Sequence, residues 1–245
     1  MDGVRVTAIL QIKDRHGHYP AVLPVKCLSL TKDSTLSIYG IYELAEKTNP
    51  VTKEHKTMIR LIALHEIRAD IPAGTIGGWI EKAENLSGYG SSVPWVGDNA
   101  MVFDDAVVQD GASLWNNAVV CGKAYVGSNA NIGGDARIYG NAQIGGAAVI
   151  AGSSQVYGDA VVTDWAVVEG CARVYGDAQI LGNSVVCGAS EIDSARVIGH
   201  SAIVGTAMIK GKRCGNVPRN KYVPDGIMYV APGRKPKWER PKHIF

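Results

Sequence analysis

Apolar residues recur at a fixed spacing through the long middle stretch from Asn99 to Lys210. A small residue opens each six-residue unit, and Val, Ile or Leu follows two positions later, as in Ala-Tyr-Val-Gly-Ser-Asn from Ala124. The apolar positions that keep this register are Val102, Val108, Leu114, Val120, Val126, Ile132, Ile138, Ile144, Ile150, Val156, Val162, Val168, Val174, Ile180, Val186 and Ile192. A one-residue deletion follows, and the phrase resumes at Val197, Ile203 and Ile209. A repeat this regular predicts a stacked architecture.

Each unit combines a short strand with a turn. The small and apolar positions alternate with a variable residue, which is the pattern of a strand with one buried face. Gly, Asn or Asp follows, as in Gly140-Asn141 and Gly158-Asp159, and these residues accept the backbone angles of turns. We therefore expect an all-β fold, a left-handed parallel β-helix with three units in each coil and about six coils.

The flanks of the repeat have a different pattern. Residues 1–70 predict a small β-rich N-terminal domain, with strands near 4–12, 21–30, 34–42 and 57–68 and a polar, helical excursion at 43–53. Residues 71–98 are expected to cap the β-helix at its start, because repeat proteins need an atypical terminal unit. Gly77 and Gly78 would allow close backbone approach there, and Trp79 would cover the end or, alternatively, contact a ligand.

The β-helix proper is expected over residues 99–210, followed by an irregular C-terminal tail over residues 211–245. Proline recurs along this tail and excludes a long helix. Only Ile227–Val230 has the composition of a short strand.

Outward positions are predicted to form ladders, because equivalent residues of successive coils stack on one another. One ladder consists of Phe103, Cys121, Tyr139, Tyr157 and Tyr175, and beside it run Arg137, Gln155 and Arg173. Three interpretations of this surface stay open. The tyrosines stabilise neighbouring strands, or the surface is a subunit interface, or it binds a partner or a ligand that carries bases, sugars or phosphates.

A second ladder is apolar and consists of Val149, Val167 and Val185. Contiguous exposed apolar residues usually mark a contact surface. We expect this valine ladder to form an oligomer interface, with the alternative that the C-terminal tail covers it in a monomer.

The hexad pattern resembles the hexapeptide-repeat, left-handed β-helix superfamily. The segment Gly77-Gly78-Trp79-Ile80-Glu81 further resembles a subgroup of phage, prophage and enterobacterial proteins, many of them labelled as acyltransferases without a demonstrated activity. Members of the superfamily commonly form homotrimers with parallel helix axes, so the resemblance implies a trimer. It also implies that coenzyme A would be the cofactor if the chain were an acyltransferase.

The charged residues are distributed unevenly. The chain has a formal net charge of +2, but from Lys210 to Phe245 ten Lys/Arg stand against two Asp/Glu, which leaves +8 on this segment and −6 on the rest. A basic tail suits phosphate contacts, so nucleic-acid binding is an alternative, although a tail packed on a neighbour is favoured.

Composition also limits the location and the metal chemistry. No stretch is apolar enough to span a membrane, no signal-peptide pattern opens the chain, and the five Cys are scattered without metal-ligand spacing, so a cytoplasmic protein with reduced thiols is expected. His16 and His18 share a turn, but no third ligand is spaced near them, and no metal site is predicted.

The residues for catalysis are sparse. Acyltransferases of the superfamily use a histidine base and a loop that projects from the coils. The hexads from Ala100 to Ile192 contain neither, and His200 is the weak candidate. We therefore expect a non-catalytic oligomeric scaffold without a cofactor. The resemblance to the subgroup further implies a phage or prophage accessory protein that binds a host protein or a small ligand. The alternatives are a coenzyme-A-dependent acyltransferase and a nucleic-acid-binding protein.

Overall fold

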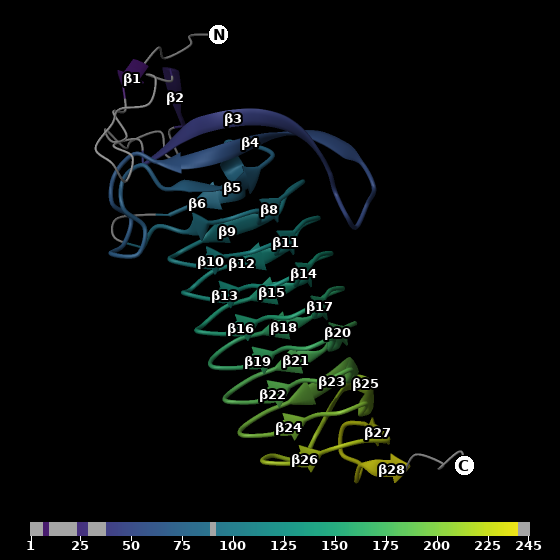
Figure 1. Ribbon diagram of the computed structural model, residues 1–245. Helices are drawn as coiled ribbons and strands as arrows, with labels where there is room; N and C mark the ends of the chain where they lie inside the picture. The colour runs from purple at the N-terminus through teal and green to yellow at the C-terminus, as the bar shows by residue number, and fades with distance from the viewer. Residues whose placement is uncertain (1–6, 10–23, 29–37, 89–91, 240–245) are drawn as a thin grey trace.

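The computed structural model describes residues 7–9, 24–28, 38–88 and 92–239, and these residues form an all-β parallel β-helix (Figure 1). Successive coils stack with their strands parallel and in register, for example Val119 beside Arg137 and Arg137 beside Gln155. The prediction that residues 18 apart stack on one face is confirmed. The handedness of the coil stays a prediction.

The coil has three faces. Face A consists of β5 (Ile76–Ile80), β8 (Met101–Val102), β11 (Val119–Val120), β14 (Arg137–Ile138), β17 (Gln155–Val156), β20 (Arg173–Tyr175), the first parts of β23 (Glu191–Val197) and β25 (Met208–Asn216), and β27 (Ile227–Val230). Face B consists of β6 (Leu86–Ser87), β9 (Val107–Gln109), β12 (Tyr125–Val126), β15 (Gln143–Ile144), β18 (Val161–Val162), β21 (Gln179–Ile180) and the ends of β23 and β25.

Face C is a separate eight-stranded sheet. Its strands are β7 (Trp95–Val96), β10 (Ser113–Leu114), β13 (Asn131–Ile132), β16 (Val149–Ile150), β19 (Val167–Val168), β22 (Val185–Val186), β24 (Ala202–Ile203) and β26 (Tyr222–Val223). Strands β10 to β24 lie within residues 99–210, and β7 and β26 extend the stack beyond the predicted repeat at either end. A short 3₁₀ turn, η1 (Ala83–Asn85), is the only helical element among the described residues.

The core is the column of small and apolar hexad positions. Ala136, Ile138 and Ile144 are fully buried, as are their equivalents along the stack. Where serine replaces alanine, its hydroxyl donates to a carbonyl three residues earlier, as from Ser154 to Ala151 at 2.7 Å. A single coil cannot bury its apolar residues alone and needs the neighbouring coils to cover them. The hexad pattern therefore has to continue from one coil to the next.

The corners between faces hold the expected turn residues. Gly140 and Gly158 have φ near +73°, and Asp104 and Asn116 have φ of +58°, all in the left-handed region. At the one-residue deletion the corner is shortened to a turn at Ser194, which has φ of +47°, and β23 continues through it from face A to face B.

Two sequence predictions need correction. The helical excursion predicted at 43–53 is wrong, because β3 (Tyr39–Thr48) continues as a strand and pairs antiparallel with β4 (His55–Ala63). Cross-strand pairing overrides the weak strand propensity of this polar segment. This hairpin is hydrogen-bonded to the β-helix through β5, and β2 (Pro24–Leu28) pairs with β3 and with β1 (Thr7–Ile9).

The prediction of an irregular tail is wrong for its described part, which adds another coil through β26 and β27. Ile227–Val230 forms the predicted strand, and β28 (Lys237–Glu239) pairs antiparallel with it. The sequence pattern missed this coil because Ile203 and Val223 are paired neighbours 20 positions apart, which breaks the hexad register. No helix in the described parts of the chain is long and apolar enough to cross a membrane.

Candidate functional site

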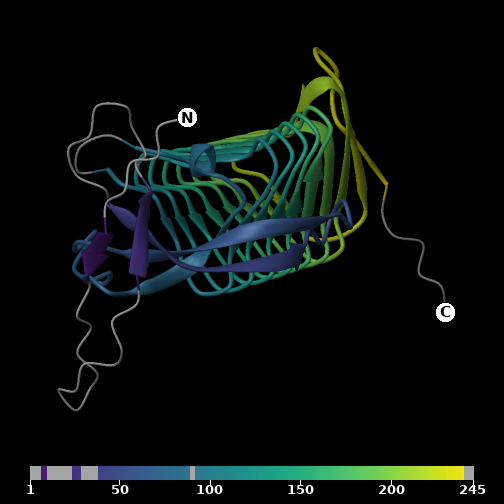
Figure 2. The ribbon, with the colours of Figure 1, turned by 90° about the horizontal axis from the view of Figure 1, so that it is seen from above.

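The β3–β4 hairpin covers the first coils of face A. It crosses the N-terminal end of the stack, and its tip bends down beside β8 (Figure 1); Figure 2 shows the same crossing from above. Between the hairpin and face A lies a buried apolar cluster that is separate from the central core. It consists of Met58 from the hairpin with Trp79, Phe103, Val119 and Cys121. The hairpin therefore buries two members of the predicted tyrosine ladder, Phe103 and Cys121.

Polar contacts fix the hairpin tip to the coils. The side chain of Asn49, which is fully buried, donates from its amide nitrogen to Asp104 at 3.3 Å and accepts from the backbone N–H of Val51 at 2.9 Å. The ammonium group of Lys56 lies 3.5 Å from Glu81 and 3.9 Å from Asp104. These bonds satisfy the buried amide and hold the tip in one position on face A.

Beyond the hairpin, Tyr139, Tyr157 and Tyr175 form a continuous stack. The ring centroids are 4.8 Å apart for the first pair and 5.2 Å for the second, with interplanar angles of 2° and 7°. Burial is the main cause that raises the pKa of each of the three hydroxyls. Because each ring face between neighbours is already occupied, this stack presents ring edges and hydroxyls rather than open faces for an inserted base.

A groove lies between the hairpin tip and face A. Its volume is about 450 Å³. The lining residues are Pro50 from the hairpin, Met101, Val119, Arg137 and Gln155 from face A, and Asn117, Asp135 and Ser153 from the preceding corner. The groove thus combines an apolar floor with side chains that donate and accept hydrogen bonds, and it contains two residues of the predicted surface, Arg137 and Gln155.

The two arginines of that surface have different environments. Arg173 donates from Nη1 to Glu191 Oε1 at 3.2 Å. Arg137 is exposed and has neither an ion-pair nor a hydrogen-bond partner among the described residues. Gln155, which lies between them, accepts a hydrogen bond from the Tyr139 hydroxyl at 3.3 Å.

The predicted cap residues lie at the first rung of face A. A Cβ on Gly78 would come within 2.4 Å of the Ala100 carbonyl oxygen, and one on Gly77 within 2.7 Å of the Val96 oxygen, so both positions require glycine. Trp79 pairs with Met101 and points outward, with Lys47 Nζ 4.0 Å from its ring centroid. It is covered by the hairpin, so the ring has no free face for a ligand.

The valine ladder lies on face C and stays uncovered by the described chain. Val149 is 37% exposed, while Val167 and Val185 are partly buried by their ladder neighbours. The described tail residues extend the end of the stack and do not cross this face.

Trp165, 70% exposed at the corner that precedes Val167, adds a large apolar side chain beside the ladder. Sequence reasoning missed it, although a Trp at a hexad position that small or polar residues occupy in the other units was a visible signal.

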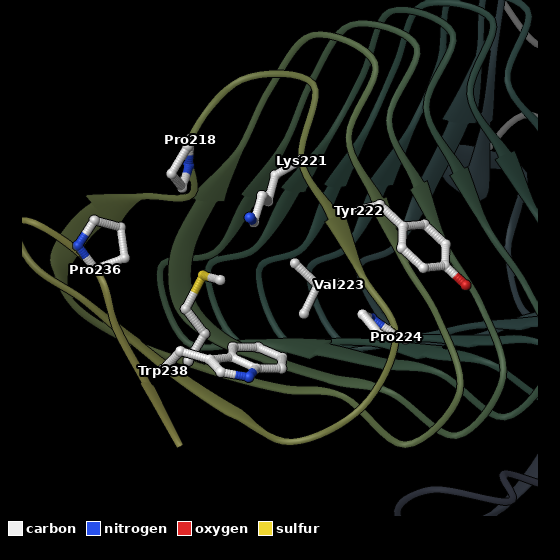
Figure 3. Close-up of a pocket in the computed structure, with 8 residues that line it drawn as sticks. Pro218, Lys221, Tyr222, Val223, Pro224, Pro236 and Trp238 are labelled. Atoms are coloured by element: carbon white, nitrogen blue, oxygen red, sulfur yellow. The ribbon is translucent and has the colours of Figure 1, made fainter. Parts of the chain in front are cut away.

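A second cavity, of about 580 Å³, lies at the C-terminal end of the stack. Figure 3 shows Lys221, Val223 and Trp238 turned toward the open middle of the last coil, with Pro218, Pro224 and Pro236 around it. Val223 is almost fully buried, and Trp238 packs against the core. This arrangement covers the end of the core, and Pro224 removes one N–H from the last rung, where it would have no following strand to pair with.

The remaining chemistry-bearing residues lie apart from the groove. His200 is exposed at a corner, where its backbone N–H donates to Asn220 at 3.0 Å, and it lines neither cavity. Burial raises the pKa of the Cys121 thiol to about 11. The described residues contain no cluster of His, Cys, Asp or Glu that would hold a metal ion, and His16 and His18 lie outside them.

Sequence reasoning missed the corner side of the groove. Asn117, Asp135 and Ser153 form a ladder of their own, in which Asn117 donates to Asp135 at 2.9 Å, and their regular spacing was visible in the sequence. Pro50 was not predictable, because only the folded hairpin brings it to this place.

Comparison of the sequence with protein-family models and with curated proteins found no match.

Proposed function

We propose that this chain is a non-catalytic, self-assembling β-helix scaffold that binds a small ligand in the groove beside the hairpin tip. The observation that carries the proposal is the groove itself, where donors and acceptors from two elements converge over an apolar floor. Small-molecule sites commonly combine a largely apolar wall with a few placed polar groups. The resemblance to phage and prophage proteins suggests the biological setting, an accessory protein in the cytoplasm of the host.

Assembly is part of the proposal. The valine ladder and Trp165 form an uncovered apolar strip along one side of the stack. Aromatic residues are enriched at protein interfaces, and a flat β-helix face offers the same strip to each neighbour. We infer a homotrimer with face C inside, which leaves the groove on face A at the outer surface.

Native mass spectrometry of the purified chain, with and without acetyl-coenzyme A, tests this function. The proposal predicts a trimer that does not gain the mass of coenzyme A and carries another small molecule from the expression host. A trimer that binds acetyl-coenzyme A would support the acyltransferase alternative instead, and His200→Ala would then be the next variant. A monomer without any bound mass would contradict the proposal.

A second candidate function has its own observation. Lys210, Arg234, Lys235 and Lys237 line a groove of about 300 Å³ around Tyr229 near the C-terminal end of face A. Such a cluster would favour nucleic acid or another polyanion. Its test is the salt dependence of binding to a single-stranded oligonucleotide, which must weaken steeply with ionic strength.

A further inference from the structure

Arg137 and Arg173 occupy equivalent positions on face A, two coils apart, with Gln155 between them. Both are exposed, so both guanidinium groups belong to the same kind of surface. The Glu191 carboxylate already forms an ion pair with Arg173. Arg137 has no such partner among the described residues, and it is the one that lines the groove. The guanidinium group of Arg137 therefore lines the groove without an ion pair to a carboxylate of the described residues.

The neighbours of Arg137 define what else a ligand would meet. The amide of Gln155 and the hydroxyl of Ser153 supply donors and acceptors, and the carboxylate of Asp135 supplies acceptors. Hydroxyl groups of a ligand can both donate to the carboxylate and accept from the amide. The Asp135 carboxylate also disfavours a ligand with many negative charges, which separates this groove from the basic groove near Tyr229.

We propose that the groove binds a small hydroxylated molecule that carries one oxyanionic group, a carboxylate or a phosphate, as in a sugar acid or a sugar phosphate. Arg137 holds the oxyanion through the two parallel N–H donors of its guanidinium fork. Gln155, Ser153 and Asp135 bind the hydroxyl groups, while Met101 and Val119 form the floor. The inference rests on the proposed function and specifies the ligand class of the same site.

Isothermal titration calorimetry with three sugars tests this ligand class. The probes are glucuronate, glucose 6-phosphate and glucose, which share a hydroxylated ring and differ in the oxyanion. At least one of the two anionic sugars is expected to bind the wild-type protein at least about tenfold more tightly than glucose, because charge-assisted hydrogen bonds are the stronger kind. The anionic sugar that binds more tightly identifies the oxyanion as carboxylate or phosphate.

Arg137→Gln and Arg173→Gln form the matched pair of variants. Each removes one exposed positive charge from the same face, so a general electrostatic effect would be equal in both. The proposal predicts that Arg137→Gln abolishes the preference for the anionic sugar, whereas Arg173→Gln changes the affinity by less than about twofold. Circular dichroism of both variants checks that the β-helix is intact.

The outcomes separate the ligand class from the function. Equal binding of glucose and both anionic sugars, or equal losses in the two variants, would overturn the role of Arg137. If no sugar bound but native mass spectrometry found another small molecule whose binding Arg137→Gln left unchanged, the ligand class would be wrong and the scaffold function would stand. If neither method found a ligand, both proposals would fail.

Discussion

The rings of Tyr139 and Tyr157 lie nearly parallel, 4.8 Å between centroids and 2° between planes. This spacing is close to the distance between neighbouring strands, so the coil repeat itself sets the stacking distance. Tyr175 continues the column on the other side of Tyr157. Stacking of this kind contributes to holding successive coils together and leaves the hydroxyl edges at the surface.

The tyrosine stack predicts a loss of stability at high pH. The folded protein raises the pKa of these hydroxyls above the ordinary tyrosine value of about 10, so the protonated form is favoured in the fold. Stability from this source is complete below about pH 10 and is lost as the pH rises through the raised values, because the unfolded chain releases its protons first. Urea unfolding measured at several pH values across this range should show that the free energy of unfolding falls less steeply with pH in Tyr157→Phe than in the wild type.

Tyr222→Phe is the control for that experiment, because Tyr222 is 63% exposed and has no ring partner among the described residues. Its loss of stability with pH should follow that of the wild type. An unchanged slope in Tyr157→Phe would show that the stack does not contribute.

Cys121 is expected to resist alkylation. It is almost fully buried under the hairpin, and burial raises the pKa of its thiol to about 11, so little reactive thiolate forms near pH 8. Peptide mapping after iodoacetamide treatment should find Cys171, which is exposed, modified before Cys121. Asn49→Ala, which removes the amide that joins the hairpin tip to Asp104, should speed the modification of Cys121. Equal rates at both thiols in the wild type would contradict the covered position of Cys121.

Gly78→Ala is predicted to destabilise the fold strongly. The added methyl group would lie 2.4 Å from the Ala100 carbonyl oxygen and 2.8 Å from a Val96 methyl group, so the first coil has to shift. Overpacking of this kind typically lowers the free energy of unfolding by about 1–3 kcal/mol. Gly133→Ala is the matched control, since its new methyl group would find its nearest neighbour, Asn116, at 3.8 Å. Equal unfolding midpoints of the two variants would contradict the close approach at Gly78.

Val167→Glu is predicted to break the proposed trimer. A charge in the middle of an apolar interface loses its water without gaining a partner, so association becomes unfavourable. Sedimentation equilibrium should show the mass falling from that of a trimer to that of a monomer. Gln143→Glu introduces the same carboxylate at an exposed position of face B and should keep the wild-type mass. A wild-type protein that sediments as a monomer would remove the assigned role of the valine ladder.

The sequence by itself determined the repetitive part of the fold, because the residues of each hexad favour a strand followed by a turn without help from distant segments. Small and apolar residues alternate within a strand, glycine and asparagine follow at the corner, and adjacent coils repeat the same pattern. These are local rules, so the buried column through Ile138, Ile144 and Ile150 and the tyrosine and valine ladders were predictable from spacing. Arg137 and Gln155 were identified on the same basis.

Only the tertiary structure decided where the non-repetitive segments lie. The hairpin folds back over face A, and this long-range packing buries Phe103 and Cys121, leaves Tyr139 at the edge and brings Pro50 to the groove. The tail becomes another coil despite its broken spacing, because backbone pairing with the previous rung needs no hexad register. The difference between Arg137 and Arg173, by contrast, follows from the 18-residue spacing itself, which places Glu191 beside Arg173 and Gln155 beside Arg137.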